Sequence, residues 1–557
     1  MATMATPRDI EGEANSGVSA DATALPPGSP QPDYAPPQNF HNLPVGARLA
    51  HFWKRWLERG ASKEVVEILR WGLRLEFWVP PFLTEVPINS SDNRTKGPIL
   101  QEQVDLMLQK QAIERVYPPY GPGYYSRIFV VPKPNGKWRP IIDLSKLNKL
   151  LKIPTFRMES IQSVWSQLLP GNYTFSIDLT DAYFHIPIHP RYRKYLRFFF
   201  KGKVYQFRAL PFGLSTAPYI FTLVMSEVKV MIHLKGGQLF LYLDDWLAQI
   251  QTYLDGLKES ELLQALVMEL GLLINREKSE LIPSQTFAFI GAYFRLDICR
   301  VYPKEENLQK LVAKLKEFLR LSWATARNFQ RLLGTVSSQF RFFPYGRLFL
   351  RPLQWHLASQ WDQLEGNPQD WIFISPQMKA CLRWWLAQTE SPVGVPLRLP
   401  ECSVSSFTDA SEQGWGAHVQ DAQETKFQGL WSNLERGLHS NVLEMRAVRL
   451  ALERVTAPVG SVILISTDNT TVKSHINKQG GTRSWSLMEE TVLLFQLAIR
   501  NSWHLKARHI PGKLNVLADN LSRVGQILPT EWSLNQEVAD LVFARWHRPL
   551  IDLCATR

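Results

Sequence analysis

The stretch QLFLYLDDWLAQI, from Gln238 to Ile250, places two adjacent acids, Asp244 and Asp245, between two apolar runs. This pattern predicts a β-hairpin with half-buried strands and with both carboxylates at its tight turn. Adjacent carboxylates at a turn repel each other, and a purely structural turn usually carries Asn-Gly or Asp-Gly instead. A divalent cation removes that repulsion, since oxygen-rich anionic clusters bind Mg²⁺. Paired acids at a turn are also common as solvated residues, so this pair alone leaves both interpretations open.

A third acid, Asp178, strengthens the metal interpretation. It ends the strand-like run YTFSID, and the turn-like run LTDAYF follows. Three carboxylates from two neighbouring strands can hold two Mg²⁺ ions, or Mn²⁺ in their place, about 3.5–4 Å apart. Such a pair of ions activates a hydroxyl nucleophile and stabilises the charge that develops during phosphoryl transfer. The pattern therefore predicts a two-metal phosphoryl-transfer site.

The bulk properties of the chain are compatible with such chemistry on a polyanion. At 557 residues the chain is too long for one hydrophobic core, and its formal net charge is +12. A basic excess suits nucleic acid but is weak support alone, because many basic proteins bind none. Cys299, Cys381, Cys402 and Cys554 form no C-x-x-C pair, which argues against a zinc knuckle or a disulfide framework.

The sequence carries no evident membrane or export signal. No apolar run is long enough to span a bilayer, and the N-terminus lacks the basic-then-apolar order of a signal peptide. We therefore expect an intracellular protein, in the cytoplasm, the nucleus or both, without a membrane partner.

The residue patterns along the chain predict an α+β multidomain protein. Residues 1–45 are rich in Pro, Ala, Ser and Gly and are expected to form a disordered tail. Helical patterns occupy 46–115, and short strands between Pro and Gly turns occupy 116–302, which predicts a domain with a central antiparallel sheet. A basic amphipathic helix opens the segment 303–395, and its charged face fits either solvent or nucleic acid. A second α/β domain is expected over 403–525, and an extension over 526–557.

A second set of acids lies in the predicted α/β domain. Each acid singly is best explained as a surface carboxylate, but together they accompany a strand, a helix, a strand and a helix in turn. The four are Asp409, Glu444, Asp468 and Asp519. Gly414 and Gly416 are expected to permit a turn and a close approach, and Ser440 or Asn441 to cap the helix that presents Glu444. This placement resembles the four-carboxylate site of ribonuclease H, which implies another two-metal site.

From Val116 to Tyr302 the chain resembles reverse transcriptases. The segments KPNGKWRPIIDLSKLN, FSIDLTDAYF, LPFGLSTAPYIF, YLDD, INREKSEL and FIGAYF follow the motifs of that family in order and at compatible spacing. The resemblance implies a polymerase right hand of fingers and palm, with thumb and connection over 303–395. It implies an RNA template, a DNA primer and deoxynucleoside triphosphates as partners. It also makes Asp178, Asp244 and Asp245 the metal-binding triad.

The same resemblance assigns roles around the incoming nucleotide. Lys133 and Arg139 resemble the basic residues that grip the triphosphate, and their alternative is a solvated basic loop. Tyr183 matches the aromatic residue that blocks a ribose 2′-hydroxyl, and its alternative is a core tyrosine. Phe212 departs from the glutamine of retroviral enzymes, which removes one polar contact to the nucleotide, although long-terminal-repeat retrotransposon enzymes also carry PFGL here. Lys278 resembles the proton donor to the leaving pyrophosphate.

Two further assignments follow from family resemblance. Ile290 and Gly291 fall at the primer grip of reverse transcriptases. From Ser403 to Arg523 the chain resembles ribonuclease H, which implies four carboxylates, two metal ions and hydrolysis of the RNA in RNA–DNA hybrids. His509 is expected in a loop ahead of Asp519, where that family often has a mobile histidine that assists product release. A lone loop histidine otherwise has no role.

The amino-acid sequences of several segments resemble most those of the pol proteins of DIRS-type retrotransposons. These segments include TDASEQGWGA, STDNTTVKSHINKQGGTRS and HIPGKLNVLADNLSR. No D-T/S-G protease motif and no His-His-Cys-Cys integrase module is present in the sequence, which fits that group better than retroviruses. The closing PLIDLCATR resembles the start of a further region, so truncation at this end is one expectation.

Two competing hypotheses remain at this point. A domesticated or decayed protein would bind nucleic acid with salt-sensitive affinity and without turnover. An RNA-dependent RNA polymerase or a telomerase-like enzyme is disfavoured by the appended nuclease-like domain. The oligomeric state is not predicted.

Overall fold

The computed structural model describes residues 43–85, 96–132, 136–232, 237–390, 392–420, 424–523 and 536–546. Most of the predicted tail, Lys133 and much of the extension 526–557 lie outside these described residues. The chain forms two compact units that alternate along the sequence. Unit 1 comprises 1–157, 177–233 and 261–279, and unit 2 comprises 158–176, 234–260 and 280–557.

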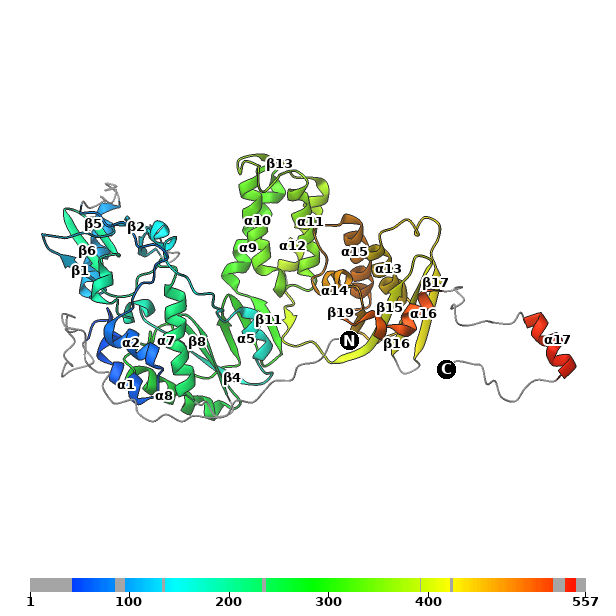
Figure 1. Cartoon of the computed structure of the whole chain (residues 1–557), viewed down its shortest axis with the longest axis horizontal. Helices are drawn as coiled ribbons and strands as arrows, with labels where there is room; N and C mark the ends of the chain where they lie inside the picture. The colour runs from blue at the N-terminus through cyan, green and yellow to red at the C-terminus, as the bar shows by residue number, and fades with distance from the viewer. Residues whose placement is uncertain are drawn as a thin grey trace, which may run out of the picture. The chain divides into compact units, whose positions relative to one another are not determined.

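Unit 1 combines short helices with two small antiparallel sheets (Figure 1). Its helices are η2 (Arg48–His51), α1 (Trp53–Glu58), α2 (Lys63–Trp71), α3 (Gly97–Gln109), α4 (Ser145–Asn148), η3 (Ala182–His185), α6 (Pro190–Arg193) and α7 (Ala217–Met231). Its strands pair in the orders β1 (Ile113–Val116), β6 (Lys203–Phe207), β5 (Arg197–Phe200) and β2 (Ile128–Pro132), β3 (Trp138–Ile142). Local chemistry sets the helix ends: Ser62 accepts a hydrogen bond from the Val65 N–H before α2, and Gly72, at φ 89°, ends it.

The hairpin predicted around Asp244 is present in unit 2. β7 (Gln238–Tyr242) pairs antiparallel with β8 (Asp245–Ile250), and the sheet has the order β4 (Tyr173–Asp178), β8, β7. Every residue of β8 after Asp245 is buried, whereas β7 is buried only in its middle. Helix α5 (Ile161–Gln167) precedes β4, and α8 (Tyr253–Glu269) follows β8.

Four helices of unit 2 pack side by side around a large apolar core (Figure 1). They are α9 (Glu305–Arg320), α10 (Ala326–Gln339), α11 (Gly346–Ala358) and α12 (Pro376–Glu390), with η4 (Phe340–Phe342) before α11. The amphipathic pattern predicted for α9 is confirmed, since Leu308, Leu311 and Phe318 are buried. The same core holds the sheet β14 (Val395–Pro396), β11 (Arg300–Pro303), β10 (Ala292–Arg295), β9 (Thr286–Phe289), and β12 (Trp323–Thr325) pairs with β13 (Trp371–Phe373).

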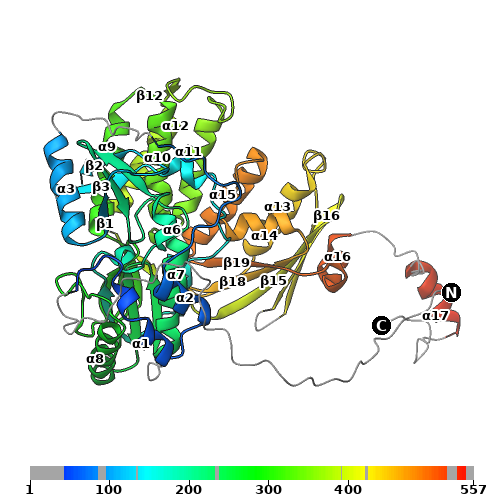
Figure 2. The same cartoon turned by 60° about the vertical axis from the view of Figure 1, so that its left-hand side comes forward.

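A five-stranded sheet occupies the C-terminal part of unit 2. Its order is β17 (Thr425–Leu430), β16 (Gly414–Gln420), β15 (Cys402–Ala410), β18 (Val462–Thr467), β19 (His504–His509). β18 runs parallel to both β15 and β19, and the other pairs are antiparallel. Helices α13 (Ser440–Leu452), α14 (Thr470–Asn477) and α15 (Trp485–Arg500) lie on one side, and α16 (Val516–Ser522) lies on the other (Figure 2). The described chain also includes η5 (Gly512–Leu514) and α17 (Gln536–Trp546).

Strand β16 explains how one sheet carries helices on both faces. Trp415 and Ala417 pack in a core cluster with residues of α13. Gly414 and Gly416 point the other way because side chains alternate along a strand. A Cβ at Gly416 would lie 2.4 Å from the carbonyl oxygen of Ala518 in α16. The predicted close approach is therefore confirmed. Gly414 is the first residue of β16, directly after a turn closed by the Ser411 N–H donating to the Gly414 carbonyl, whereas Gly416 lies inside the strand.

Among the described residues, no helix combines the length and the apolar character that a membrane crossing requires.

Candidate active sites

The β7–β8 turn presents two carboxylates on a strained backbone. Tyr242 pairs with Asp245, so Leu243 and Asp244 form the turn, and both acids are exposed. Leu243 has φ 53°, a left-handed conformation that is unfavourable for a branched side chain. The indole N–H of Trp246 donates a hydrogen bond to the Leu243 carbonyl at 3.0 Å and holds this conformation. Backbone strain of this kind concentrates at functional sites, where surrounding contacts keep it in place.

Asp178 has an electrostatic environment suited to a cation. It is the last residue of β4 and is only 9% exposed. Its backbone N–H donates to Ser279 Oγ at 3.0 Å, and its Oδ2 lies 3.5 Å from Lys278 Nζ. Its Oδ1 is buried and has no hydrogen-bond partner. A buried carboxylate oxygen without a partner is costly, and a bound cation would satisfy it.

Three of the residues assigned to the nucleotide lie together in unit 1. The Tyr183 ring lies 4.9 Å from that of Phe212, and the Arg139 guanidinium lies 5.7 Å from the Phe212 ring. Phe212 is 37% exposed, whereas Tyr183 is 8% exposed and also packs against Phe221 of α7 at 5.3 Å. The cluster offers an aromatic surface with a cation at its edge. Phe221 was not singled out from the sequence, because it reads as an ordinary core residue of a helix.

The predicted primer-grip residues form the β9–β10 turn. Ile290 has φ 45° and Gly291 has φ 77°, so both central residues are left-handed, as tight hairpins require. Glycine adopts this conformation freely, but a β-branched residue such as Ile290 is strained there. Asn307 of α9 donates a hydrogen bond from Nδ2 to the Gly291 carbonyl at 3.5 Å. Asn307 was missed because a polar residue in the first turns of a helix is usually only solvated.

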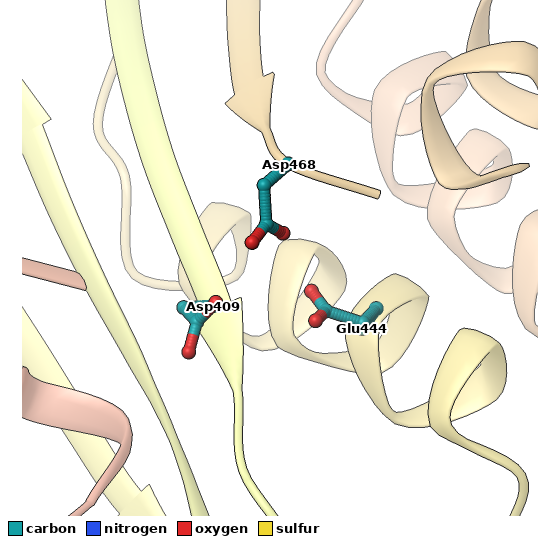
Figure 3. A group of neighbouring side chains, drawn as sticks. All are labelled: Asp409, Glu444 and Asp468. Atoms are coloured by element: carbon teal, nitrogen blue, oxygen red, sulfur yellow. The ribbon is translucent and has the colours of Figure 1, made fainter. Parts of the chain in front are cut away.

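Three of the four acids in the second predicted set, all but Asp519, converge at the five-stranded sheet. Asp409 lies on β15, Glu444 lies on α13, and Asp468 directly follows β18. One carboxylate oxygen from each lies within 4.8 Å of the others, and Figure 3 shows the three side chains pointing toward a common centre. Asp519 of α16 is held by Arg523, whose guanidinium is 2.7 Å from its Oδ1. Its charge still raises the pKa of Asp409.

The electrostatics of this cluster fit a divalent cation. Burial, reinforced by the charges of Asp409 and Asp468, raises the pKa of Glu444 to about 9. Burial also raises the pKa of Asp409, and the negative charges of Asp468 and Asp519 add to that shift. Glu444 Oε2 is buried and has no hydrogen-bond partner. Converging carboxylates with an orphaned oxygen match the hard oxygen ligands that Mg²⁺ and Mn²⁺ prefer.

Neighbouring polar residues hold these carboxylates in place. Ser522 Oγ of α16 donates to Asp409 Oδ2 at 2.8 Å. Asn469, next to Asp468, donates from Nδ2 to Asn441 Oδ1 at 2.8 Å, which ties the end of β18 to the first turn of α13. The predicted cap of α13 by Ser440 or Asn441 is wrong. His439 is the N-cap, and its Nδ1 accepts a hydrogen bond from the Asn441 N–H at 3.1 Å.

His509 lies in a different setting from the one predicted. It is the last residue of β19 rather than part of a loop, because the parallel pairing with β18 extends to it. It is exposed, and its register partner is Thr467, the residue before Asp468. The following turn approaches the acids closely: a Cβ at Gly512 would lie 3.0 Å from Asp468 Oδ2. Gly512 was missed because the sequence offered only its proximity to a proline.

Part of the chain matches a known family. The family described as "Reverse transcriptase (RNA-dependent DNA polymerase)" matches residues 131–294. This range contains Asp178 and the β7–β8 turn with Asp244 and Asp245. Residues 131–294 are therefore similar to reverse transcriptases.

Several proteins with similar sequences are polyproteins of viruses or of a transposon. A polyprotein of cassava vein mosaic virus is 22% identical over 458 residues, which cover 78% of this chain and 67% of that protein. The Pol polyprotein of transposon opus from Drosophila melanogaster is 25% identical over 56% of this chain and 28% of its own length. The genome polyprotein of petunia vein clearing virus is 23% identical over 70% of this chain and 17% of its own length. The chain thus spans only part of each polyprotein.

A solved structure shares the fold. The foamy viral protease–reverse transcriptase, solved with double-stranded DNA, aligns with a TM-score of 0.51 and 17% identity over 85% of this chain and 84% of that one. A likeness at this identity shows the fold alone. The predicted polymerase fold of mixed α and β content is therefore confirmed.

Proposed function

We propose that this chain is an RNA-directed DNA polymerase that also hydrolyses the RNA strand of RNA–DNA hybrids. One observation carries the proposal: a segment that matches the reverse transcriptase family is followed, in the same chain, by a separate cluster of converging carboxylates, two of them buried. Polymerisation by phosphoryl transfer and hydrolysis of a phosphodiester both need anionic oxygens that hold divalent cations.

In the polymerase half, Asp178, Asp244 and Asp245 would hold two Mg²⁺ or Mn²⁺ ions. The bound ions would activate the primer 3′-hydroxyl and neutralise the triphosphate. Two observations support this triad: β4 and β8 are neighbours in one sheet, and Asp178 Oδ1 lacks a partner.

The remaining residues of the polymerase half bind, orient or donate. Arg139 would pair with the triphosphate of a deoxynucleotide and Tyr183 would exclude a 2′-hydroxyl, while the Phe212 ring packs between them. Lys278, already 3.5 Å from Asp178, would donate a proton toward the leaving pyrophosphate. Lys133 keeps its proposed triphosphate role from the sequence motif alone.

In the nuclease half, Asp409, Glu444, Asp468 and Asp519 would hold the ions that activate the attacking water. Burial, and after it the negative charges of the neighbouring acids, raises the pKa values of Glu444 and Asp409, and bound ions would offset both effects. Asp519 would join by turning from Arg523, an exposed pair that costs little to break. His509, beside Thr467 in the sheet, would assist product release.

The polymerase half is tested by primer extension on an RNA template with Mg²⁺. We expect Asp244→Asn to lower the extension rate by about 100-fold or more, since loss of a metal ligand removes several kcal/mol of transition-state stabilisation. Asp105→Asn is the matched control, because Asp105 is exposed on α3 and undergoes the same change of charge. Unchanged extension by Asp244→Asn would show that the polymerase assignment is wrong.

The nuclease half is tested on a labelled RNA–DNA hybrid. We expect Asp409→Asn to abolish RNA cleavage while it leaves primer extension unchanged, because its carboxylate belongs only to the second cluster. Persistent cleavage would contradict the nuclease assignment. If the wild-type protein shows neither activity but still binds nucleic acid, the non-catalytic alternative is favoured instead.

The proposal extends to the biological setting of the enzyme. The segment resemblances favour a DIRS-type retrotransposon origin, with an RNA template, a DNA primer and deoxynucleoside triphosphates as substrates, acting inside the cell. Binding of a template–primer with and without deoxynucleotides by the purified chain tests the substrates, and an epitope-tagged chain in cells tests the location. Exclusive recovery from the medium would refute the intracellular setting.

A further inference from the structure

Three arginines gather where the helical part of unit 2 meets the five-stranded sheet. Arg341 lies in η4, and Arg347 and Arg351 lie in α11. Burial lowers the pKa values of Arg341 and Arg351, and the charge of Arg347 adds to both shifts. All three side chains are partly buried, and none has a carboxylate partner among the described residues.

The hydrogen bonding of this arginine cluster is incomplete. Arg351 donates from Nη1 to Gln354 Oε1 at 2.9 Å and from Nη2 to the Lys478 carbonyl at 3.3 Å. The Nε atoms of Arg341 and Arg351 are buried and have no acceptor. Arg341 and Arg347 instead lie against the Phe340 ring, at 5.7 and 4.6 Å. Partly buried cations that repel one another and keep buried N–H groups without acceptors are costly unless an anion completes the site.

The start of α11 adds positive potential of the same sign. This helix has 13 residues, no acid in its first turn and no side-chain cap. The positive end of its dipole therefore favours an anion. The positive charge of Arg347 in the first turn adds to this potential and does not neutralise it. A structural role would call for a carboxylate at this position, and the sequence provides a guanidinium instead.

We propose that the cluster of Arg341, Arg347 and Arg351 binds the phosphates of a nucleic-acid strand. Guanidinium groups present planar, fixed donors that match phosphate oxygens in pairs. A strand is favoured over a free anion because three cations spread over two elements match successive phosphates rather than one group. This inference rests on the proposed function, which supplies such a strand.

The docking of α11 makes the proposed site rigid relative to the nuclease carboxylates. Trp355 donates from Nε1 to the Gly481 carbonyl at 3.1 Å, and Tyr345 donates from its hydroxyl to the Trp503 carbonyl at 2.9 Å. Leu348 of α11 packs with Met488 and Phe495 of α15. A strand held by the arginines is therefore held at a fixed distance from Asp409, Glu444 and Asp468, which would select where the RNA is cut.

The salt dependence of hybrid binding tests the inference. Anisotropy of a labelled RNA–DNA hybrid is measured over a range of KCl concentrations for wild type, Arg347→Gln and Arg500→Gln. Arg500 is exposed at the end of α15 and makes the same change of charge. We expect Arg347→Gln to reduce the slope of log K against log salt by about 1, the value for one lost phosphate contact, and Arg500→Gln to leave it unchanged. An unchanged slope for Arg347→Gln overturns the inference.

Thermal unfolding separates this result from misfolding and from a free-anion site. Arg347→Gln removes repulsion, so we expect its midpoint without ligand to equal or exceed that of wild type. If inorganic phosphate raises the wild-type midpoint more than that of the variant while both keep the same hybrid slope, the cluster binds a free anion and the inference is wrong. Primer extension by wild type reports on the proposed function separately.

Discussion

Buried carboxylates in this protein fall into two kinds according to their partners. Glu490 is 2% exposed, and its oxygens accept hydrogen bonds from Arg446 and Arg449, so its charge is satisfied within the fold. Asp178 and Glu444 are 9% and 8% exposed, yet each keeps one buried oxygen without a partner. The fold thus balances buried charge where it serves structure and leaves it unbalanced where a cation is expected.

This contrast predicts that Glu444 costs stability in the absence of metal. We expect Glu444→Gln to raise the unfolding midpoint in EDTA at neutral pH, because burial and the charges of Asp409 and Asp468 force the Glu444 carboxyl to take up a proton on folding, a cost that a neutral amide does not have. Adding Mg²⁺ should raise the wild-type midpoint but not that of the variant. Differential scanning fluorimetry measures both effects. Glu412→Gln, an exposed neighbour, should do neither, and equal Mg²⁺ stabilisation of all three proteins would count against the metal site.

A second residue-scale prediction concerns His185, which is fully buried in η3. Burial lowers the pKa of His185 to about 4, and the positive charge of Arg48 acts in the same direction. The hydrogen bond to the Ala182 carbonyl and the negative charge of Asp181 act in the opposite direction. Nδ1 lies 3.1 Å from the Ala182 carbonyl and Nε2 accepts from the Leu273 N–H at 3.0 Å, so the neutral ring fits both bonds.

The sign of the pH effect follows from where the proton binds. Between about pH 6.5 and 4 the unfolded chain binds a proton that the folded chain excludes, so stability is complete above pH 6.5 and falls as the pH drops toward 4. The loss should reach about 3 kcal/mol, from a shift of roughly 2.5 pKa units. Urea unfolding at several pH values should show a flatter profile for His185→Gln, while the exposed His509→Gln keeps the wild-type profile. An equally steep profile for His185→Gln would refute this account.

At the scale of elements, the packing of α16 on β16 controls the nuclease site. A Cβ at Gly416 would lie 2.4 Å from the Ala518 carbonyl and 2.5 Å from the Ser522 N, both backbone atoms that cannot yield locally. We expect Gly416→Ala to displace α16, to break the bond from Ser522 to Asp409, and to lower hybrid cleavage by about 10-fold or more. Primer extension should remain, and cleavage at the wild-type rate would contradict this coupling.

Elements with strong local signals were predictable, and elements defined by distant partners were not. The β7–β8 hairpin follows from alternating apolar residues around adjacent acids, and α9 follows from its spacing of leucines. The end of β19 at His509 depends on pairing with β18, which no local pattern reports. The capping role of His439 likewise depends on which ring nitrogen meets the Asn441 N–H, a geometry beyond residue preferences.

At the scale of the whole molecule, the chain alternates between two compact units. Segments 158–176 and 234–260 belong to unit 2 although their neighbours on both sides belong to unit 1. The sequence predicts contiguous domains, because composition and periodicity change along the chain and do not report contacts between distant segments. The candidate carboxylates were nonetheless locatable, since each lies at or beside the end of a strand or within a helix whose local pattern is clear.

Within unit 2, the contacts of α11 predict that the helical part and the five-stranded sheet unfold together. Trp355 is central, because it donates to the Gly481 carbonyl and its ring meets that of Trp485 edge-on at 5.4 Å. Losing this edge-on aromatic contact together with the indole hydrogen bond costs about 2 kcal/mol, which weakens the contacts that join the two parts. We therefore expect Trp355→Ala to split a shared calorimetric transition into two, with the sheet unfolding separately. Trp371→Ala, whose side chain is 67% exposed, should leave the transition whole. A single transition in Trp355→Ala would mean that the two parts are coupled elsewhere, and the fixed spacing between the arginine cluster and the nuclease carboxylates would then not depend on this helix.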